Sequence, residues 1–476
     1  MGGDFSEPPG NDKKEMKHRH PYIILCLAAS GLLSGCGIYT RYSRPALEVN
    51  ADSLYRATPA DTDSVTLPSK SWRELFTDPC LQTLIATGLE RNTELGIARL
   101  QTEEAQAVLQ NARLSCLPSV SLNPQAGVSH YGGETKQTYN LGLSASWEAD
   151  VFGRVTNARR AAAASLEQSR AYAQAVETQL VATIAESYYT LLMLDEQLAI
   201  SSATLENWDE TIATLEALVQ AGRANDVAVR QARASRAALR ASMLTISRSI
   251  SETENALSAL LKEPAHAISR GTLADQRFPD SMSVCLPLSL LSNRPDVRQA
   301  EAALAGSFYA TNDARAAFYP ALTLSGSLGW TNNGGGSILN PGKWLSSAVA
   351  SLTAPLFNKG TNIANLKVAE AQQQEALLRF EQKLLTAGNE VNDALAEWQT
   401  ADGRISNDLQ QTADLEAAAE NTLLLVRYTS ANYLEVLTAQ QSLLAARLTL
   451  AQDRISRILA VVHLYHALGG GRESVS

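Results

Sequence analysis

The stretch Asn-Ala-Arg-Leu-Ser-Cys-Leu-Pro, residues 111–118, returns 202 residues later as Asp-Ala-Arg-Ala-Ala-Phe-Tyr-Pro, residues 313–320. Each copy is followed by a short alternating segment, residues 119–122 and 321–324. A second such segment, a short turn and a long helical stretch come next in both halves. A repeat of this length indicates that one structural unit was duplicated. The 476 residues are therefore expected to form one body of two similar halves.

The segments after the two prolines are predicted to be strand pairs, at about 118–150 and 320–355. Apolar side chains alternate there with small or polar ones, which is the period of a β-strand with two different faces. The alternating positions are Tyr139, Leu141, Leu143, Ala145 and Trp147 in the first half, and Leu322, Leu324, Gly326, Leu328 and Trp330 in the second.

Alternation alone would suit a soluble β-sandwich as well as a membrane barrel. Aromatic residues at the strand ends, a strand length of roughly nine to eleven residues and the export signal described below favour strands that span a membrane. Four strands cannot close a barrel, because an open edge in lipid leaves backbone groups unpaired. Several copies of the chain are therefore expected to share one transmembrane β-barrel.

Long coiled-coil helices are predicted after each strand pair, at about 154–262 and 359–468. Residues 153–220 contain no proline and no glycine after Gly153, so a continuous helix there would be roughly 100 Å long. Apolar residues recur every seven positions, which is typical of a left-handed coiled coil. The first repeat is taken as residues 85–264 and the second as 294–476, with a linker at 265–293.

The first 35 residues are predicted to be a signal peptide. A short apolar run, residues 22–33, ends in Leu-Ser-Gly-Cys at 33–36, the lipobox of bacterial lipoproteins. Cys36 is expected to carry a covalent lipid, which anchors a protein without spanning the membrane. The sequence leaves open whether Met1 or Met16 is the natural start. Residues 36–84 are expected to be an extended segment.

The sequence contains no motif typical of several other functional classes. The net charge is −9 and no basic face is visible, so nucleic-acid binding is not expected. No nucleophile elbow, phosphate loop or His-Glu-x-x-His motif is present, so neither an enzyme nor a cofactor is predicted. Cys80, Cys116 and Cys285 lack disulfide or metal-site spacing and are expected to be small buried side chains.

Several further motifs resemble those of the outer-membrane efflux factors, the TolC-type channel-tunnels, in the lipoprotein branch of RND-type tripartite systems. The motifs are Arg294-Pro295-Asp296, residues 314–320, Tyr433 to Leu437, and residues 464–471. The resemblance implies a mainly α fold with a transmembrane β-barrel. It implies a homotrimer with a 12-stranded barrel in the outer membrane and a helical tunnel in the periplasm. The partners implied are a periplasmic adaptor, an inner-membrane pump and outer-membrane lipid.

The resemblance also implies where the tunnel closes. The matching gate positions are Leu434, Glu435 and Thr438, and many relatives carry aspartate where this chain has Thr438. Leu434 could instead be the first residue of the coiled-coil seam and Glu435 a solvated residue. The two hairpin turns are the expected adaptor-docking surface: Gly222, Arg223, Ala224, Asn225, Ser430, Ala431, Asn432 and Tyr433.

Three functions follow from these observations. The first is a passive efflux duct for drugs, other toxic compounds or metal ions. The second is a protein-secretion duct of the same fold, and the third is a structural coiled-coil lipoprotein without a pore. The sequence does not identify the cargo. Met193, Met243 and Met282 are widely spaced, so no thioether relay for copper or silver is visible, which favours organic compounds.

Overall fold

The computed structural model describes residues 40–45, 71–278, 294–332, 343–428 and 433–470. The packing divides the chain into two compact units. The sheet unit comprises Met1–Pro45, Ala107–Ala164 and Ala305–Glu375, and the helical unit comprises Ala46–Gln106, Ser165–Leu304 and Ala376–Ser476. Cys36 and three of the expected docking residues, Ser430, Ala431 and Asn432, lie outside the described residues.

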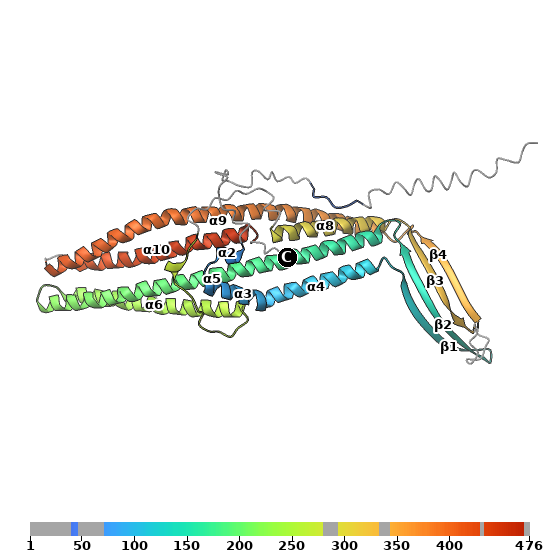
Figure 1. Cartoon of the computed structure of the whole chain (residues 1–476), viewed down its shortest axis with the longest axis horizontal. Helices are drawn as coiled ribbons and strands as arrows, with labels where there is room; N and C mark the ends of the chain where they lie inside the picture. Colours follow the sequence, from blue (N-terminus) through green and yellow to red (C-terminus); the bar gives the residue numbers. More distant parts are fainter. Residues whose placement is uncertain (1–39, 46–70, 279–293, 333–342, 429–432, 471–476) are drawn as a thin grey trace, which may run out of the picture. The chain divides into compact units, whose positions relative to one another are not determined.

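From α4 and from α8 onward, the same order of one helix, two strands and two long helices occurs twice (Figure 1). The first half contains α2 (Trp72–Leu75), α3 (Pro79–Arg91), α4 (Thr93–Leu114), β1 (Ser119–Tyr131), β2 (Glu134–Ala149), α5 (Arg154–Gln220) and α6 (Asp226–Leu260). The second half follows the short 3-10 helix η3 (Leu273–Asp275) and contains α8 (Pro295–Ala316), β3 (Ala321–Thr331), β4 (Lys343–Thr353), α9 (Thr361–Tyr428) and α10 (Tyr433–Ala467).

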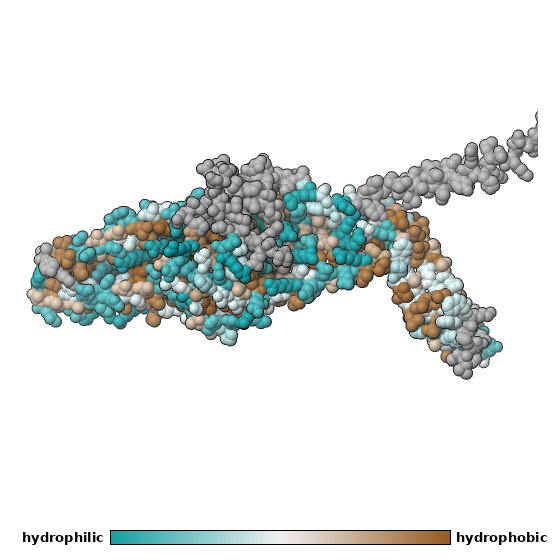
Figure 2. Space-filling view, in the orientation of Figure 1, coloured by the Kyte–Doolittle hydropathy of each residue, from teal (hydrophilic) through white to brown (hydrophobic). Residues whose placement is uncertain are grey.

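The four strands form one antiparallel sheet in sequence order. Its register puts like side chains on one face, with Leu122 opposite Leu143 and Leu143 opposite Leu328. The other face carries serines, and Ser121 Oγ lies 2.8 Å from Ser144 Oγ. Figure 2 shows apolar side chains gathered on the strands. One apolar and one polar face suit a sheet that separates lipid from water.

The long helices pair as coiled coils. α5 has 67 residues and α6 has 35. Trp208, Ile212 and Leu215 of α5 are buried in one cluster with Val229 and Leu239 of α6. The seven-residue spacing thus places one apolar stripe of each helix in the shared seam. None of the described helices is long and apolar enough to cross a membrane.

Asn92 divides the helical stretch that precedes the first strand pair. It stands between α3 and α4, and its side-chain oxygen accepts a hydrogen bond from the Leu95 N–H (3.0 Å). Its amide group donates to the carbonyl of Leu260 (2.9 Å), the last residue of α6. One side chain therefore satisfies the backbone at the beginning of one helix and at the end of another.

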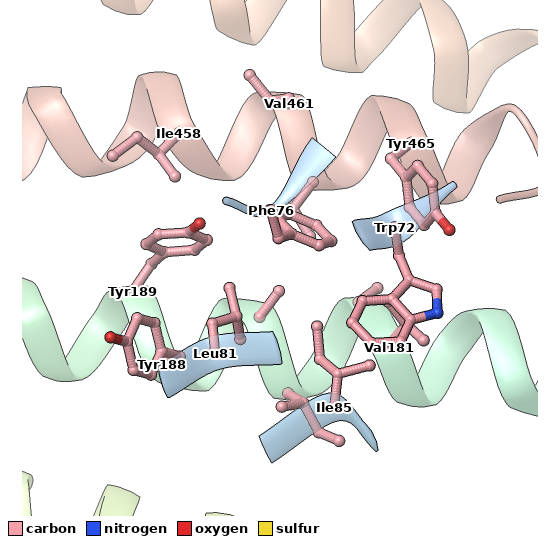
Figure 3. Close-up of a cluster of buried hydrophobic side chains, with 14 of the residues drawn as sticks. Trp72, Phe76, Leu81, Ile85, Val181, Tyr188, Tyr189, Ile458, Val461 and Tyr465 are labelled. Carbon is pink, nitrogen blue, oxygen red and sulfur yellow. The ribbon is translucent and has the colours of Figure 1, made fainter. Parts of the chain in front are cut away.

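The main core of the helical unit is built around short helices inserted between long ones. Trp72 and Phe76, from α2 and its C-cap, lie between α5 and α10 (Figure 3). The Phe76 ring meets Tyr465 of α10 edge to face, with centroids 5.9 Å apart. Each such buried side chain contributes about 1.5–3 kcal/mol. The N-terminal part of the chain therefore joins the two coiled coils of the unit.

One expectation about cysteines is wrong. Cys116 is exposed, and Cys80 is only partly buried. Cys116 lies in the turn between α4 and β1, where residues 115–118 are all exposed. Its carbonyl accepts a hydrogen bond from Trp147 Nε1 (3.0 Å). Burial therefore does not explain this thiol. Cys285 lies outside the described residues.

Candidate functional site

The turn between α5 and α6 has a defined geometry. Gly222 adopts a positive φ of 72°. The N–H of Arg223 donates to the Leu218 carbonyl (2.8 Å) and that of Gly222 donates to the Val219 carbonyl (3.0 Å). This is a Schellman cap, which favours glycine at the left-handed position. The turn is thus held by backbone bonds.

Most residues of this turn are exposed. Gly222 and Arg223 are exposed and Ala224 is half-buried. Asn225 caps α6, because its side chain accepts a hydrogen bond from the Val227 N–H (2.9 Å). The first of the two expected docking turns is therefore a preformed surface with one small side chain, Ala224, near its centre.

The beginning of α10 carries the expected gate residues. Leu434 is 50% exposed, and Glu435 and Thr438 are exposed as well. Tyr433 is partly buried and packs against the seam of α5 and α6, in which Leu437 is buried. In the single chain the seam therefore begins at Tyr433 and Leu437, and Leu434 lies on another face.

Two side-chain hydrogen bonds join α10 to the first coiled coil. Gln440 Nε2 donates to Thr211 Oγ1 of α5 (2.8 Å), and Gln441 Nε2 donates to Ser235 Oγ of α6 (2.9 Å). Both lie within two turns of Glu435. The position of the expected gate residues thus depends on contacts between the two halves of the chain.

Ion pairs hold α9 to α10. Arg447 pairs with Glu416 (2.6 Å) and Arg457 with Asp402 (3.1 Å). A further pair differs from these because its acid is buried: Asp453 of α10 is 3% exposed, and Arg404 Nε lies 2.9 Å from its Oδ2.

Asp453 also faces a second carboxyl. Asp408 of α9 is also buried, and its carboxyl acts on the pKa of Asp453. Burial and the Asp408 carboxyl raise the pKa of Asp453 above its usual range, against the opposing charge of Arg404. The seam of this hairpin therefore contains two buried carboxyls, one of which has a raised pKa.

The sequence motif Arg294-Pro295-Asp296 connects the beginning of α8 to α9 and to the end of α10, and we call this set of contacts the Arg294 joint. The sequence alone does not reveal this role. Arg294 is 2% exposed. Its guanidinium donates to Asp296 (2.8 Å), to Glu390 of α9 (2.6 Å) and to the Ala467 carbonyl at the end of α10 (2.7 Å). Burial alone would raise the pKa of Asp296, but the Arg294 bond and charge lower it to about 2. A cation at the last carbonyls of a helix also suits its dipole.

The glycine motif at the chain's C-terminal end completes this joint. Gly469 and Gly470 have φ values of 92° and 68°. A Cβ on Gly470 would lie 2.8 Å from Thr178 Cγ2, and one on Gly469 would lie 3.1 Å from the Arg294 Cα. Glycine is required at both positions, because the backbone has a positive φ and because a Cβ would come too close to Thr178 or Arg294. The two motifs lie far apart in sequence and meet in space.

A family model decides the class of protein. The model described as outer membrane efflux protein matches residues 84–262 and 286–470. The chain belongs to this family. The cation efflux system protein CusC of Escherichia coli K12 is 31% identical over 461 residues, covering 95% of this chain and 100% of CusC. The toluene efflux pump outer membrane protein TtgF of Pseudomonas putida is 30% identical and covers 95% of this chain and 97% of its own.

Solved structures agree with this assignment. The open state of the Neisseria gonorrhoeae MtrE outer membrane channel matches with a TM-score of 0.83 and 29% identity, over 91% of this chain and 98% of that one. The expected fold class, the outer-membrane location and the role as an efflux channel are therefore confirmed. The efflux family is a class of channels, which favours a duct over the secretion and pore-free alternatives.

Proposed function

We propose that three copies of this efflux channel form one duct of a tripartite pump. The observation that carries the proposal is the four-stranded sheet, in which β1 and β4 are the edges. An unpaired backbone group in lipid costs several kcal/mol, so edge strands must find partners. Three copies supply twelve strands, a size within the range of closed membrane barrels.

In this assembly the lipid on Cys36 adds an anchor, and the long helices form the periplasmic tunnel. An adaptor protein meets the turns at 222–225 and 430–433, and an inner-membrane pump delivers the cargo. The duct is passive and performs no bond chemistry. The preformed, outward-facing turn around Ala224 supports the docking role.

The gate of the tunnel is proposed at Leu434, Glu435 and Thr438. Three-fold symmetry would bring three copies of each side chain to one axis, where glutamates favour cations and leucines can pack together. The exposure of all three residues on the single chain supports this assignment over a seam role for Leu434. Thr438 adds no charge, so Glu435 carries the acidic character.

The cargo is proposed to be small toxic compounds that the pump selects. The names of the relatives divide between cation efflux for CusC and toluene efflux for TtgF, at nearly equal identity to this chain. The channel fold therefore serves both kinds of cargo. Similarity alone does not favour one of them.

The function is tested by deleting the gene from its own host and measuring growth inhibition and cell accumulation. Silver and copper salts represent metal cargo, and toluene and ethidium represent organic cargo. We expect higher sensitivity to at least one class, restored by the intact gene. Unchanged sensitivity and accumulation for both classes would overturn the proposal.

A further inference from the structure

The described segment 40–45 lies against α5 and α8 in the sheet unit. The backbone N–H of Tyr42 donates to Tyr309 Oη (3.1 Å). The Tyr42 ring meets Phe308 edge to face, with centroids 5.9 Å apart and an interplanar angle of 67°. These contacts fix Tyr42, which is half-buried, to the face of α8.

Arg160 of α5 completes the contact surface. Its guanidinium lies 5.8 Å from the centre of the Tyr309 ring and 3.5 Å from the Thr40 carbonyl. A cation over an aromatic face contributes about 0.5–1 kcal/mol at an exposed site. Arg160, Phe308 and Tyr309 together form what we call the N-terminal dock.

The dock lies close to the places where helices meet strands. Arg160 is six residues from Arg154, where α5 begins, a distance of about 9 Å along the helix. Tyr319, three residues after α8, stacks on Phe152 with centroids 5.0 Å apart. The dock therefore holds the segment 40–45 near the end of the sheet at which the strands give way to helices.

The few residues between Cys36 and the dock limit how far from the dock the lipid can lie. Cys36 precedes Thr40 by four residues, so their Cα atoms lie within about 14 Å of each other. If segment 40–45 were released, the next residue known to be buried would be Trp72, and a tether of the intervening length reaches about 120 Å. Only the docked tether is short compared with a hydrocarbon core of about 30 Å.

We propose that the N-terminal dock is the receptor for the lipidated N-terminus of this same chain, and that it sets the depth at which the sheet enters the outer membrane. This inference rests on the proposed lipidation of Cys36 and on the proposed outer-membrane duct. The dock residues act as positioning residues: they hold the acyl chains level with the helix–strand boundary, so that anchor and strands meet one leaflet together.

Two changes to the lipidated chain test this role. Replacing both aromatic dock residues, Phe308→Ala with Tyr309→Ala, should lower the amount of protease-resistant protein in outer membranes several-fold. Tyr172→Ala, which removes a partly exposed aromatic side chain of α5, is the matched control and should leave it unchanged. Inserting ten Gly/Ser residues between Ile38 and Tyr39 should lower insertion by a similar factor, because the longer tether adds about 34 Å of reach.

The linker variant separates positioning from packing, since it keeps both the lipid and every dock contact. Normal insertion of the linker variant would overturn the proposal, as would normal insertion of the double dock variant or a mature N-terminus without lipid. The readout is insertion, so it does not depend on transport. Inserted protein that fails to restore efflux would contradict the proposed function and leave the dock in place.

Discussion

Arg294 holds together parts of the chain that the sequence gives no reason to connect. Its partners Glu390 and Ala467 are 96 and 173 residues away. Removing a buried charge leaves its partners unpaired and costs about 3–5 kcal/mol. The resemblance to efflux factors marks Arg294-Pro295-Asp296 as a motif, but only the three-dimensional contacts explain why arginine is needed.

The glycines of the same joint give the first prediction. Gly470→Ala should destabilise the chain by about 1–2 kcal/mol from the positive φ alone, with the contact to Thr178 adding to it. Thermal unfolding of the detergent-solubilised protein, followed by its helical signal, measures the change. Gly403→Ala is the control: it lies inside α9 with no atom within 4 Å of the new Cβ, and should stabilise by about 0.5–1 kcal/mol. Equal shifts of the same sign would contradict this account.

Glu435 is the residue on which charge selection at the gate depends. Glu435→Ala should lower the permeability of cations relative to anions, because a three-fold ring of carboxylates is removed. The reversal potential in a salt gradient across a planar bilayer measures the ratio. Glu104→Ala removes the same charge from an exposed position on α4 and should have no effect. An unchanged ratio in the Glu435 variant would exclude this residue as the gate.

At the scale of the element, the seam between α9 and α10 contains the carboxyl pair Asp408–Asp453. The raised pKa of Asp453 means that the folded state binds a proton more tightly than the unfolded chain. Its stabilising contribution is complete below the unfolded pKa, about 3.9, and is lost as the pH rises through the folded pKa. Above the folded pKa, burial and the neighbouring Asp408 carboxyl oppose the charge on Asp453, and the Arg404 charge offsets part of this cost.

Asp408→Asn should accordingly stabilise the protein at pH 7 by about 1 kcal/mol, because an amide donor replaces a like charge. The gain should shrink as the pH falls toward 4, where Asp453 of the wild type is protonated more easily than in the unfolded chain. Thermal unfolding across this pH range measures it. Asp393→Asn, an exposed position on the same helix, is the control. A gain that is constant with pH would contradict a raised pKa at Asp453.

The turn between α5 and α6 is the element that should meet the adaptor. Ala224→Asp should reduce cross-linking to the adaptor and lower efflux at least tenfold, because the turn has a rigid backbone and a small central side chain. Ala217→Asp, at an exposed position in the last turns of α5, should leave both nearly unchanged. Normal cross-linking of the Ala224 variant would remove this turn from the docking surface.

For the molecule as a whole, local patterns in the sequence predict most of the strands and long helices. The period-two segments become strands, and the seven-residue spacing of Trp208 and Leu215 becomes a seam. Contacts between distant segments are not predictable in this way. Seam spacing includes Leu434, yet this side chain is 50% exposed, because Tyr433 and Leu437 occupy the surface of α5 and α6. The N-terminal dock likewise depends on contacts over 267 residues.

The repeat also predicts how neighbouring copies pair. Leu122 and Leu324 are equivalent in the two halves, and they face Leu143 and Ala350. Leu143 and Ala350 are therefore equivalent as well. Leu143 pairs with Leu328, whose equivalent in β1 is Ala126. If the copies close one barrel by the same symmetry, Ala350 of one copy lies opposite Ala126 of the next.

Cysteine cross-linking across this contact tests the shared barrel most directly. The variant with Ala126→Cys and Ala350→Cys, oxidised in isolated outer membranes, should yield covalent species of two and three copies on a denaturing gel. Neither single variant should form these species. The double variant with Ala126→Cys and Ser346→Cys places the two thiols about 13 Å out of register and should cross-link far less. Cross-linking of the designed pair no greater than that of the single variants, in protein that has reached the membrane, would contradict the three-copy channel.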